Sequence, residues 1–193
     1  MSCMLTIISG GLNQGKTSYL LQHYLKERKG GGFVCRKTFL ENVFTGYEIY
    51  NLQNGFSMPF ICRNAYRPTG WDEICTMGDF SFSGKAFDYA ESIVKKLILD
   101  KLNPVYIDEI GPLELQEKGF CSLFRLALDK SDEIHVAVRE SCVEDVIRYF
   151  KISEYRIVDV AQGKNRAKAG HQQHRKSVFH YSRFETPCPP SYF

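Results

Sequence analysis

The sequence predicts an α/β fold in which a mainly parallel sheet is flanked by helices, and three features lead to this expectation. Short apolar runs alternate along the chain with longer runs whose apolar residues recur at helical spacing. Such alternation is typical of parallel strands joined by crossover helices. The short apolar runs and the helical runs are the first two features. The third is a glycine-rich stretch, 10–17, between the first apolar run and the first helical run. The length of 193 residues favours one domain, which we place at 1–161.

The first elements follow from local signals. Residues 5–9 are an apolar strand, and residues 15–29 are expected to be a helix because three leucines and Tyr24 lie on one face. The three glycines at 30–32 end this helix, since glycine is a poor helix former. Residues 33–35 then form a short apolar strand.

Residues 36–82 differ in character, and we expect a small antiparallel β insertion at the side of the α/β core. Residues 44–52 are strand-like and rich in aromatic side chains, and Asn54-Gly55 is a strong signal for a two-residue hairpin turn. Residues 58–63 are the expected returning strand, and the proline within them suggests a sheet edge.

The alternation resumes after the insertion. Ser83 is the expected N-cap of a helix at 84–101, and 104–107 is the next strand. The remaining predicted elements are a helix at 120–128, a strand at 134–138, a helix opened by a capping box at 141–144, and a strand at 156–160.

The C-terminal residues 162–193 have a different composition. They contain six Lys or Arg, one acidic residue and few aliphatic side chains, and we expect a flexible or irregular basic tail. The whole chain has 25 basic and 22 acidic residues, so 19 and 21 remain in residues 1–161. This near-neutral body has no basic stripe, and nucleic-acid binding by the core is therefore not expected.

Cysteine usage and hydropathy indicate where the protein works. Seven scattered cysteines without a C-x-x-C pair argue against a zinc site and against a disulfide framework. No apolar run approaches the length of a membrane helix, and the N-terminus lacks the basic region of a secretion signal. We therefore expect a cytoplasmic protein without a membrane partner.

The stretch 10–17 reads G-x-x-x-x-G-K-[ST], the Walker A or P-loop pattern. Gly10 and Gly15 allow a tight turn whose N–H groups point at phosphate oxygens, and the positive end of the following helix faces the same anion. Lys16 reaches the β- and γ-phosphates, and the Thr17 hydroxyl is a ligand for Mg²⁺. A glycine-rich turn that merely precedes a lysine is the alternative, and the flanking strand and helix argue against it. The predicted nucleotide-binding residues are Gly10, Gly11, Leu12, Asn13, Gln14, Gly15, Lys16, Thr17 and Ser18.

A second nucleotide element is predicted at 105–109, an apolar strand that ends in two acids, as a Walker B strand does. The Asp108 carboxylate is placed to hold Mg²⁺, usually through water, and Glu109 to orient or deprotonate an attacking water. A strand that ends in a solvated acidic turn is the alternative. Glu114 is expected either to reach the metal region or to cap the following helix.

The segment Asp108 to Leu115, DEIGPLEL, resembles the DEIG signature of a family of small nucleoside-triphosphatases from thermophilic bacteria and archaea, whose human member is the cancer-related nucleoside-triphosphatase. The resemblance covers roughly residues 1–160. It implies a RecA-like or kinase-like P-loop fold and slow Mg²⁺-dependent hydrolysis of ATP, GTP and other NTPs. It also assigns phosphate binding to 10–17, the metal to Asp108 and the catalytic base to Glu109. Many members carry a proline and a further glycine where this loop has Asn13 and Gln14.

Several arginines are candidates for contacts with the phosphates. Arg139 follows the strand at 134–138 and is predicted to stabilise charge on the γ-phosphate, the alternative being a solvated or salt-bridged side chain. An arginine finger from Arg36, Arg63, Arg67 or a neighbouring subunit is also possible, although an exposed hairpin often carries arginine for solubility. The sequence does not distinguish a monomer from a homo-oligomer.

These features favour a Mg²⁺-dependent NTPase, with Lys16, Glu109 and Arg139 as its catalytic residues. Broad base use is expected because no N-K-x-D guanine reader is present. The first alternative is a nucleoside or small-metabolite kinase, in which the insertion and residues 71–82 form the acceptor site and Glu109 activates a hydroxyl. The second is a nucleotide-binding switch without catalysis, which does not need the second acid, Glu109.

Overall fold

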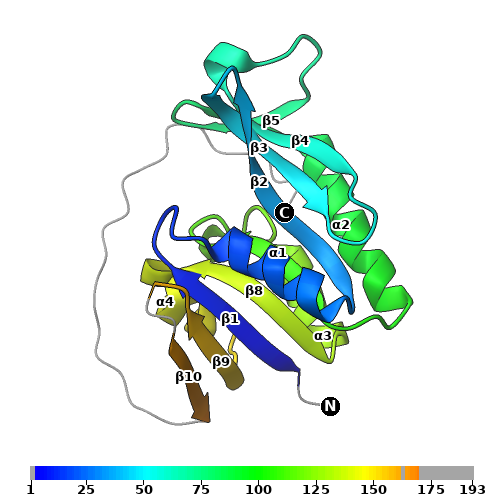
Figure 1. The fold of residues 1–193 in the computed structure, drawn as a ribbon, viewed down its shortest axis with the longest axis vertical. Helices are drawn as coiled ribbons and strands as arrows, with labels where there is room; N and C mark the ends of the chain where they lie inside the picture. Colours follow the sequence, from blue (N-terminus) through cyan, green and yellow to red (C-terminus); the bar gives the residue numbers. More distant parts are fainter. Residues whose placement is uncertain (1–2, 162–163, 170–193) are drawn as a thin grey trace.

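The computed structural model describes residues 3–161 and the backbone of 164–169. Within these residues one ten-stranded sheet runs through the molecule in the order β10-β9-β1-β8-β7-β2-β3-β4-β6-β5 (Figure 1). The strands are β1 (Met4–Gly10), β2 (Gly31–Leu40), β3 (Val43–Asn51), β4 (Ser57–Arg63), β5 (Glu73–Met77), β6 (Phe80–Ser83), β7 (Val105–Ile110), β8 (Glu133–Arg139), β9 (Glu154–Asp159) and β10 (Lys164–Ala169). The helices are α1 (Lys16–Glu27), α2 (Gly84–Leu99), α3 (Cys121–Lys130) and α4 (Val143–Tyr149), with short 3-10 turns η1 (Asn64–Tyr66), η2 (Glu114–Gln116) and η3 (Glu140–Cys142).

The five strands β9, β1, β8, β7 and β2 pair in parallel, which confirms the predicted mainly parallel α/β fold. β1 lies inside this group, with Ile7 opposite Val136 of β8 and Ile157 of β9. Because parallel strands end at a common edge, the segments that follow β1, β7 and β8 meet at the carboxyl edge of the sheet, where ligands bind in open α/β folds.

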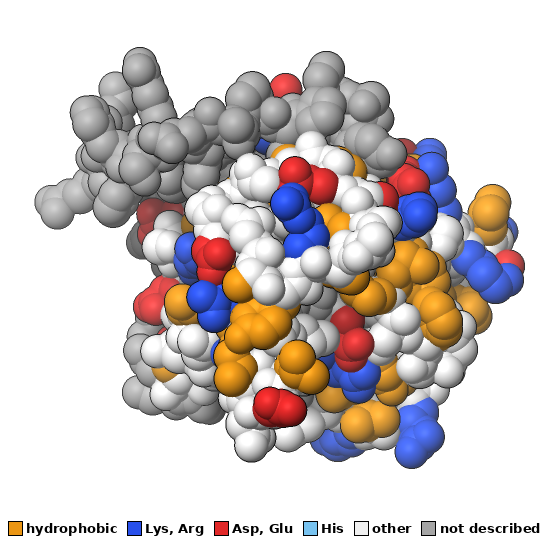
Figure 2. All heavy atoms as spheres, turned by 90° about the horizontal axis from the view of Figure 1, so that it is seen from above, with side chains coloured by type: hydrophobic (Ala, Val, Ile, Leu, Met, Phe, Trp, Pro, Cys, Tyr) orange, Lys and Arg blue, Asp and Glu red, His pale blue; other side chains and the backbone are white. Residues whose placement is uncertain are grey.

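The antiparallel strands extend the same sheet, whereas the sequence suggested an insertion beside it. β2 begins in the parallel group and continues to Leu40, so that its second half pairs antiparallel with β3. β4, β6 and β5 follow in antiparallel order. The predicted turn at Asn54-Gly55 lies within the connection between β3 and β4, but the loop spans residues 52–56 rather than two. The end of the molecule that carries these strands exposes apolar side chains with single acidic and basic side chains between them (Figure 2).

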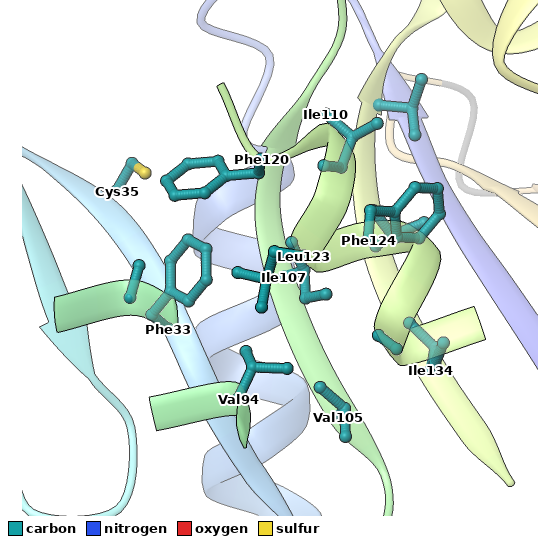
Figure 3. Packing of buried hydrophobic residues seen from close by; sticks show 14 of the residues in the cluster. Phe33, Cys35, Val94, Val105, Ile107, Ile110, Phe120, Leu123, Phe124 and Ile134 are labelled. Carbon is teal, nitrogen blue, oxygen red and sulfur yellow. The ribbon is translucent and has the colours of Figure 1, made fainter. Parts of the chain in front are cut away.

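The helices cover both faces of the sheet because successive strand residues point to opposite sides. On one face, Leu20 of α1 packs against a cluster that includes Ile8, Val34 and Tyr106. On the other face, a larger core gathers residues of α2, α3 and α4. In that core, Phe33 and Phe120 lie close to each other, with their ring centroids 5.0 Å apart (Figure 3). Ser83 caps α2 as predicted, because its side chain accepts a hydrogen bond from the backbone N–H of Ala86.

Three local expectations are wrong. Ser141 does not cap α4, whose N-cap is Cys142 without a side-chain cap; Ser141 lies instead in η3. Residues 164–169 form β10 against β9, although the sequence suggested an irregular tail from residue 162. The rest of that tail lies outside the described residues. Among the described residues, cysteines 3, 35, 62, 121 and 142 are free thiols. Cys75 is disulfide-bonded, although the sequence argued against disulfides.

Candidate functional site

The P-loop connects the end of β1 to the start of α1 at the carboxyl edge of the sheet. The backbone is left-handed at Asn13 (φ 61°) and at Gly15 (φ 92°), which turns the chain tightly into the helix. A Cβ on Gly10 would lie 2.6 Å from Cγ2 of Val160, so this position needs glycine for close packing. Leu12 is exposed at the loop tip, and Ser18 is exposed on the first turn of α1.

Two side chains of the loop bind the loop itself. The Lys16 ammonium group donates hydrogen bonds to the carbonyl oxygens of Gly10 (3.0 Å) and Gly11 (2.9 Å). Oε1 of Gln14 accepts a hydrogen bond of 2.6 Å from the backbone N–H of Gly11. An anion in the loop would take over these donors, since phosphate oxygens are the stronger acceptors.

Gln14 therefore competes with phosphate for the Gly11 amide, which leads to a prediction. Gln14→Ala is expected to tighten binding of a non-hydrolysable NTP analogue by about 2- to 10-fold, the range of one net hydrogen bond of roughly 0.5–1.5 kcal/mol. Isothermal titration calorimetry measures the change. The matched control is Gln22→Ala on the exposed part of α1, which should leave affinity unchanged. If Gln14→Ala binds the NTP analogue more weakly than the wild type while Gln22→Ala does not, Gln14 instead holds the loop in the conformation that binds phosphate.

Asp108 is fully buried at the end of β7, next to the start of α1. Its carboxylate accepts hydrogen bonds from the backbone N–H groups of Cys35 (3.0 Å) and Glu109 (3.0 Å). The Thr17 hydroxyl lies close enough to lower the pKa of Asp108. Burial raises the pKa of Asp108 to about 7, and the negative charge of Glu109 adds to the rise. The structure thus brings together the two side chains predicted to handle the metal.

A hydroxyl and a single carboxylate suit Mg²⁺, which prefers oxygen ligands and completes its shell with water and phosphate oxygens. Residues 3–161 contain no cluster of three or more His, Cys, Asp or Glu side chains that would hold a metal by themselves. A cation at Thr17 and Asp108 would also offset the burial of the Asp108 charge. The residues present therefore fit a metal that arrives with the nucleotide.

Glu109 lies in a local irregularity of β7. Ile107 pairs with Val136 and Ile110 with Val138, so two residues of β7 stand opposite one of β8. Such a bulge redirects a side chain. Glu109 has a left-handed backbone (φ 66°) and an exposed side chain, a conformation that costs about 1–3 kcal/mol outside glycine.

Arg139 ends β8 and stands opposite Gly10 in the sheet register. It is exposed and lines the same cavity as Glu109 and Leu12. Within residues 3–161 it forms no ion pair. Its position at the carboxyl edge next to the P-loop is suited to contact a phosphate.

The three candidate arginine fingers form ion pairs with carboxylates of the antiparallel region. They are Arg36, Arg63 and Arg67. Arg36 bonds Glu48 through Nε (3.0 Å), and its guanidinium lies 3.6 Å from the centroid of the Tyr50 ring. The other two pair locally, Arg63 with Asp79 at 2.6 Å and Arg67 with Glu73 at 2.6 Å. None of the three lines the cavity beside Glu109.

Glu114 is a loop anchor in the structure, which decides between its two expected roles. It is buried, and its two oxygens accept the backbone N–H groups of Gly111 (2.8 Å) and Phe120 (2.9 Å). Phe120 is the N-cap of α3, so Glu114 connects the loop after β7 to this helix. Burial is the main reason why the pKa of Glu114 rises to about 7.

This raised pKa predicts a pH-dependent contribution to stability. Glu114 binds its proton more tightly in the folded state, so its contribution is largest below pH 4.5 and is lost as pH rises through about 7. The free energy of unfolding of the wild type, relative to Glu114→Gln, is expected to fall by on the order of 2–3 kcal/mol across this window. Urea unfolding at several pH values measures it. An offset between the two proteins that does not change with pH would contradict the assignment.

Beside Glu109 lies a cavity of about 340 Å³. Its walls come from separate segments: the antiparallel strands, the start of α2 and the loop after β7. They include Met77 and Phe82, which lie in the region that the kinase alternative expects to form an acceptor site. Tyr47 of β3 also lines it and was not expected at the site. Burial raises the pKa of Tyr47, and the Glu109 charge raises it further, which reflects the closeness of the two side chains.

A mainly parallel sheet with a G-x-x-x-x-G-K-T loop between β1 and α1, and with an acidic pair near the carboxyl end of β7, is the arrangement of a P-loop NTPase fold. The chain belongs to the NTPase family, whose sequence profile matches residues 6–181. This match extends about 20 residues beyond the region covered by the resemblance read from the sequence.

Two solved structures share the fold. The solution structure of a human cancer-related nucleoside triphosphatase is 18% identical, has a TM-score of 0.54, and aligns over 81% of this chain and 87% of its own. The crystal structure of THEP1 from the hyperthermophile Aquifex aeolicus is 19% identical, has a TM-score of 0.60, and aligns over 81% of this chain and 90% of its own. No curated protein sequence matches the chain. In the described residues, no helix has the length and apolar character to cross a membrane.

Proposed function

We propose that this member of the NTPase family is a Mg²⁺-dependent hydrolase that releases the γ-phosphate of ATP, GTP and other NTPs. The observation that carries the proposal is the nearness of Thr17, in the first turn of α1, to the buried Asp108 carboxylate of β7, whose pKa the Thr17 hydroxyl lowers. This nearness joins the phosphate-binding loop to the acidic pair at one point on the carboxyl edge of the sheet.

In this proposal the phosphates bind at the N-terminus of α1. The amides of the loop and the positive helix end neutralise them, and Lys16 exchanges its two carbonyl partners for β- and γ-phosphate oxygens. Thr17 and Asp108 would hold a Mg²⁺ ion, which would supply positive charge to neutralise the charge that develops on the phosphates. These groups position the γ-phosphate and require no covalent intermediate.

Glu109 is the proposed general base. The bulge in β7 turns its side chain away from the buried Asp108 and toward the cavity, so that it can accept the proton of a water aligned with the γ-phosphate. Arg139 is proposed to stabilise the charge that grows on the transferred phosphoryl group. The second carboxylate also favours hydrolysis over a nucleotide switch without catalysis.

Phosphate release from ATP, GTP, CTP and UTP tests the proposal. With Mg²⁺ we expect release from all four, with kcat/KM values within about tenfold of one another, because no base-reading motif is present. Excess EDTA should abolish release. No release from any nucleotide would overturn the hydrolase assignment, and release from one base only would overturn the broad specificity.

A further inference from the structure

The cavity beside Glu109 has an apolar wall built mainly from phenylalanine rings. Phe60, Phe82, Phe87 and Phe120 line it, together with Ile61 and Met77. The rings of Phe60 and Phe87 lie 4.9 Å apart in an edge-to-face arrangement, and those of Phe87 and Phe120 lie 5.0 Å apart. Aromatic walls of this kind favour a flat apolar ring as occupant.

The polar groups of the cavity converge at one side. Glu109, Arg139 and Tyr47 belong to the lining, as does Leu12 of the P-loop. The charges of Glu109 and Arg139 both act on the Tyr47 hydroxyl, so the three side chains lie near one another. Both oxygens of Glu114 are occupied by backbone N–H groups, so this carboxylate is not free to recognise a ligand. A bound molecule would therefore meet hydrogen-bonding groups mainly beside Glu109.

The base of the bound NTP does not suit this cavity. Asp108 lies near Thr17 at the start of α1, so in the proposed function the acidic pair stands at the γ-phosphate end of the triphosphate. Glu109, the next residue, lines the cavity. The nucleoside lies at the opposite end of the triphosphate and cannot reach the cavity while the γ-phosphate lies beside Glu109. An occupant of the cavity is therefore a second molecule.

We propose that the cavity binds a small, uncharged alcohol with one or two apolar rings, and that its hydroxyl accepts the γ-phosphoryl group. The inference rests on the proposed use of an NTP at the P-loop and names a second substrate for the same site. The volume of about 340 Å³ is at the small end of ligand pockets, which limits the ligand to one or two rings. Sugars and charged metabolites are disfavoured, since the aromatic wall leaves their polar groups without partners.

The transfer is balanced without a further reactant. The hydroxyl oxygen of the alcohol forms a bond to the γ-phosphorus, and the bond from that phosphorus to the β,γ-bridging oxygen breaks. The electron pair of the broken bond leaves with the nucleoside diphosphate, and the hydroxyl proton passes to the Glu109 carboxylate. Water takes the place of the alcohol when the cavity is empty, which gives hydrolysis.

The test uses the full chain with Mg²⁺ and γ-³²P-labelled ATP, with benzyl alcohol, 2-phenylethanol or indole-3-ethanol as probes and glycerol as the polar control. Labelled phosphate ester and free phosphate are separated and quantified. We expect ester from at least one ring alcohol and none from glycerol. Met77→Trp, which fills the cavity, should lower the ratio of ester to free phosphate by about tenfold or more. Leu40→Trp, at an exposed position outside the cavity, should leave both rates unchanged.

The outcomes separate this inference from the proposed function. Phosphate release without ester from any ring alcohol would overturn the acceptor site and leave the hydrolase standing. If a ring alcohol yields ester, and no free phosphate is released when the alcohol is left out, the acceptor site would be supported and the hydrolase overturned. Ester formed from glycerol as readily as from a ring alcohol would overturn the assignment to the apolar cavity. So would a ratio of ester to free phosphate in Met77→Trp that equals the wild-type ratio. Absence of both ester and free phosphate would overturn both proposals.

Discussion

Replacing Lys16 with alanine is expected to lower NTP turnover by on the order of 10²–10³-fold or more, the loss seen when a single charge-stabilising donor is removed. The Lys16 ammonium group lies against the carbonyls of Gly10 and Gly11, at the mouth of the loop. It is therefore the group best placed to neutralise the β- and γ-phosphates. Steady-state phosphate release, together with calorimetric titration of an NTP analogue, measures the loss in rate and in binding.

Lys26→Ala is the matched control, because Lys26 lies in the last turn of the same helix. It should retain wild-type turnover and affinity. The melting temperatures of both variants show whether they remain folded. If Lys16→Ala is folded and turns over NTP at the wild-type rate, the P-loop is not part of the active site.

Glu109→Gln is expected to lower kcat by about 10²–10⁴-fold, the usual contribution of a general base, with little change in NTP affinity. Glutamine keeps the size and the hydrogen-bonding reach of the side chain but does not accept a proton at neutral pH. The separation of kcat from affinity distinguishes a base from a residue that merely shapes the site. Glu41→Gln, at the exposed turn between β2 and β3, should be without effect. Full turnover in Glu109→Gln would show that another group activates the nucleophile.

The left-handed backbone at Glu109 gives an independent test of the same assignment. Glycine adopts φ 66° at little cost, so Glu109→Gly is expected to be inactive and yet about 1 kcal/mol more stable to unfolding. A Glu109→Gly protein that is more stable but inactive would indicate that the strained backbone at residue 109 serves to position the Glu109 carboxylate. A Glu109→Gly protein that is both inactive and less stable would show that the side chain is needed for the fold.

The parts of the fold that were predictable depend on local signals. The P-loop is defined by glycines and a lysine within eight residues, and the N-cap at Ser83 by a hydroxyl three residues before the amide it binds. The parallel order of the central strands followed from their alternation with helices. The capping box at Ser141 failed although its pattern was present, because the chain there continues from β8 into η3 and no side-chain cap forms.

Side chains whose roles depend on distant partners were not predictable in the same way. Glu114 was equally compatible with the metal region and with a helix cap, and its bonds to Gly111 and Phe120 decide the matter. Arg36 was a candidate for phosphate contact until its partner Glu48 appeared across the strand pair. The role of each side chain depends on which carboxylate or amide lies near it in the folded protein. A short sequence pattern does not contain that information.

The sequence by itself determined the α/β class, the glycine-rich loop at 10–17 and the strand that carries Asp108 and Glu109, because each is encoded within a few consecutive residues. Only the tertiary structure decided that the antiparallel strands continue the central sheet, that Thr17 lies near Asp108, and that phenylalanines from separate segments enclose a cavity beside Glu109. The physical reason is that pairing order and cavity walls arise from the burial of apolar surface between segments far apart in the chain. A local pattern contains no information on which of those segments become neighbours.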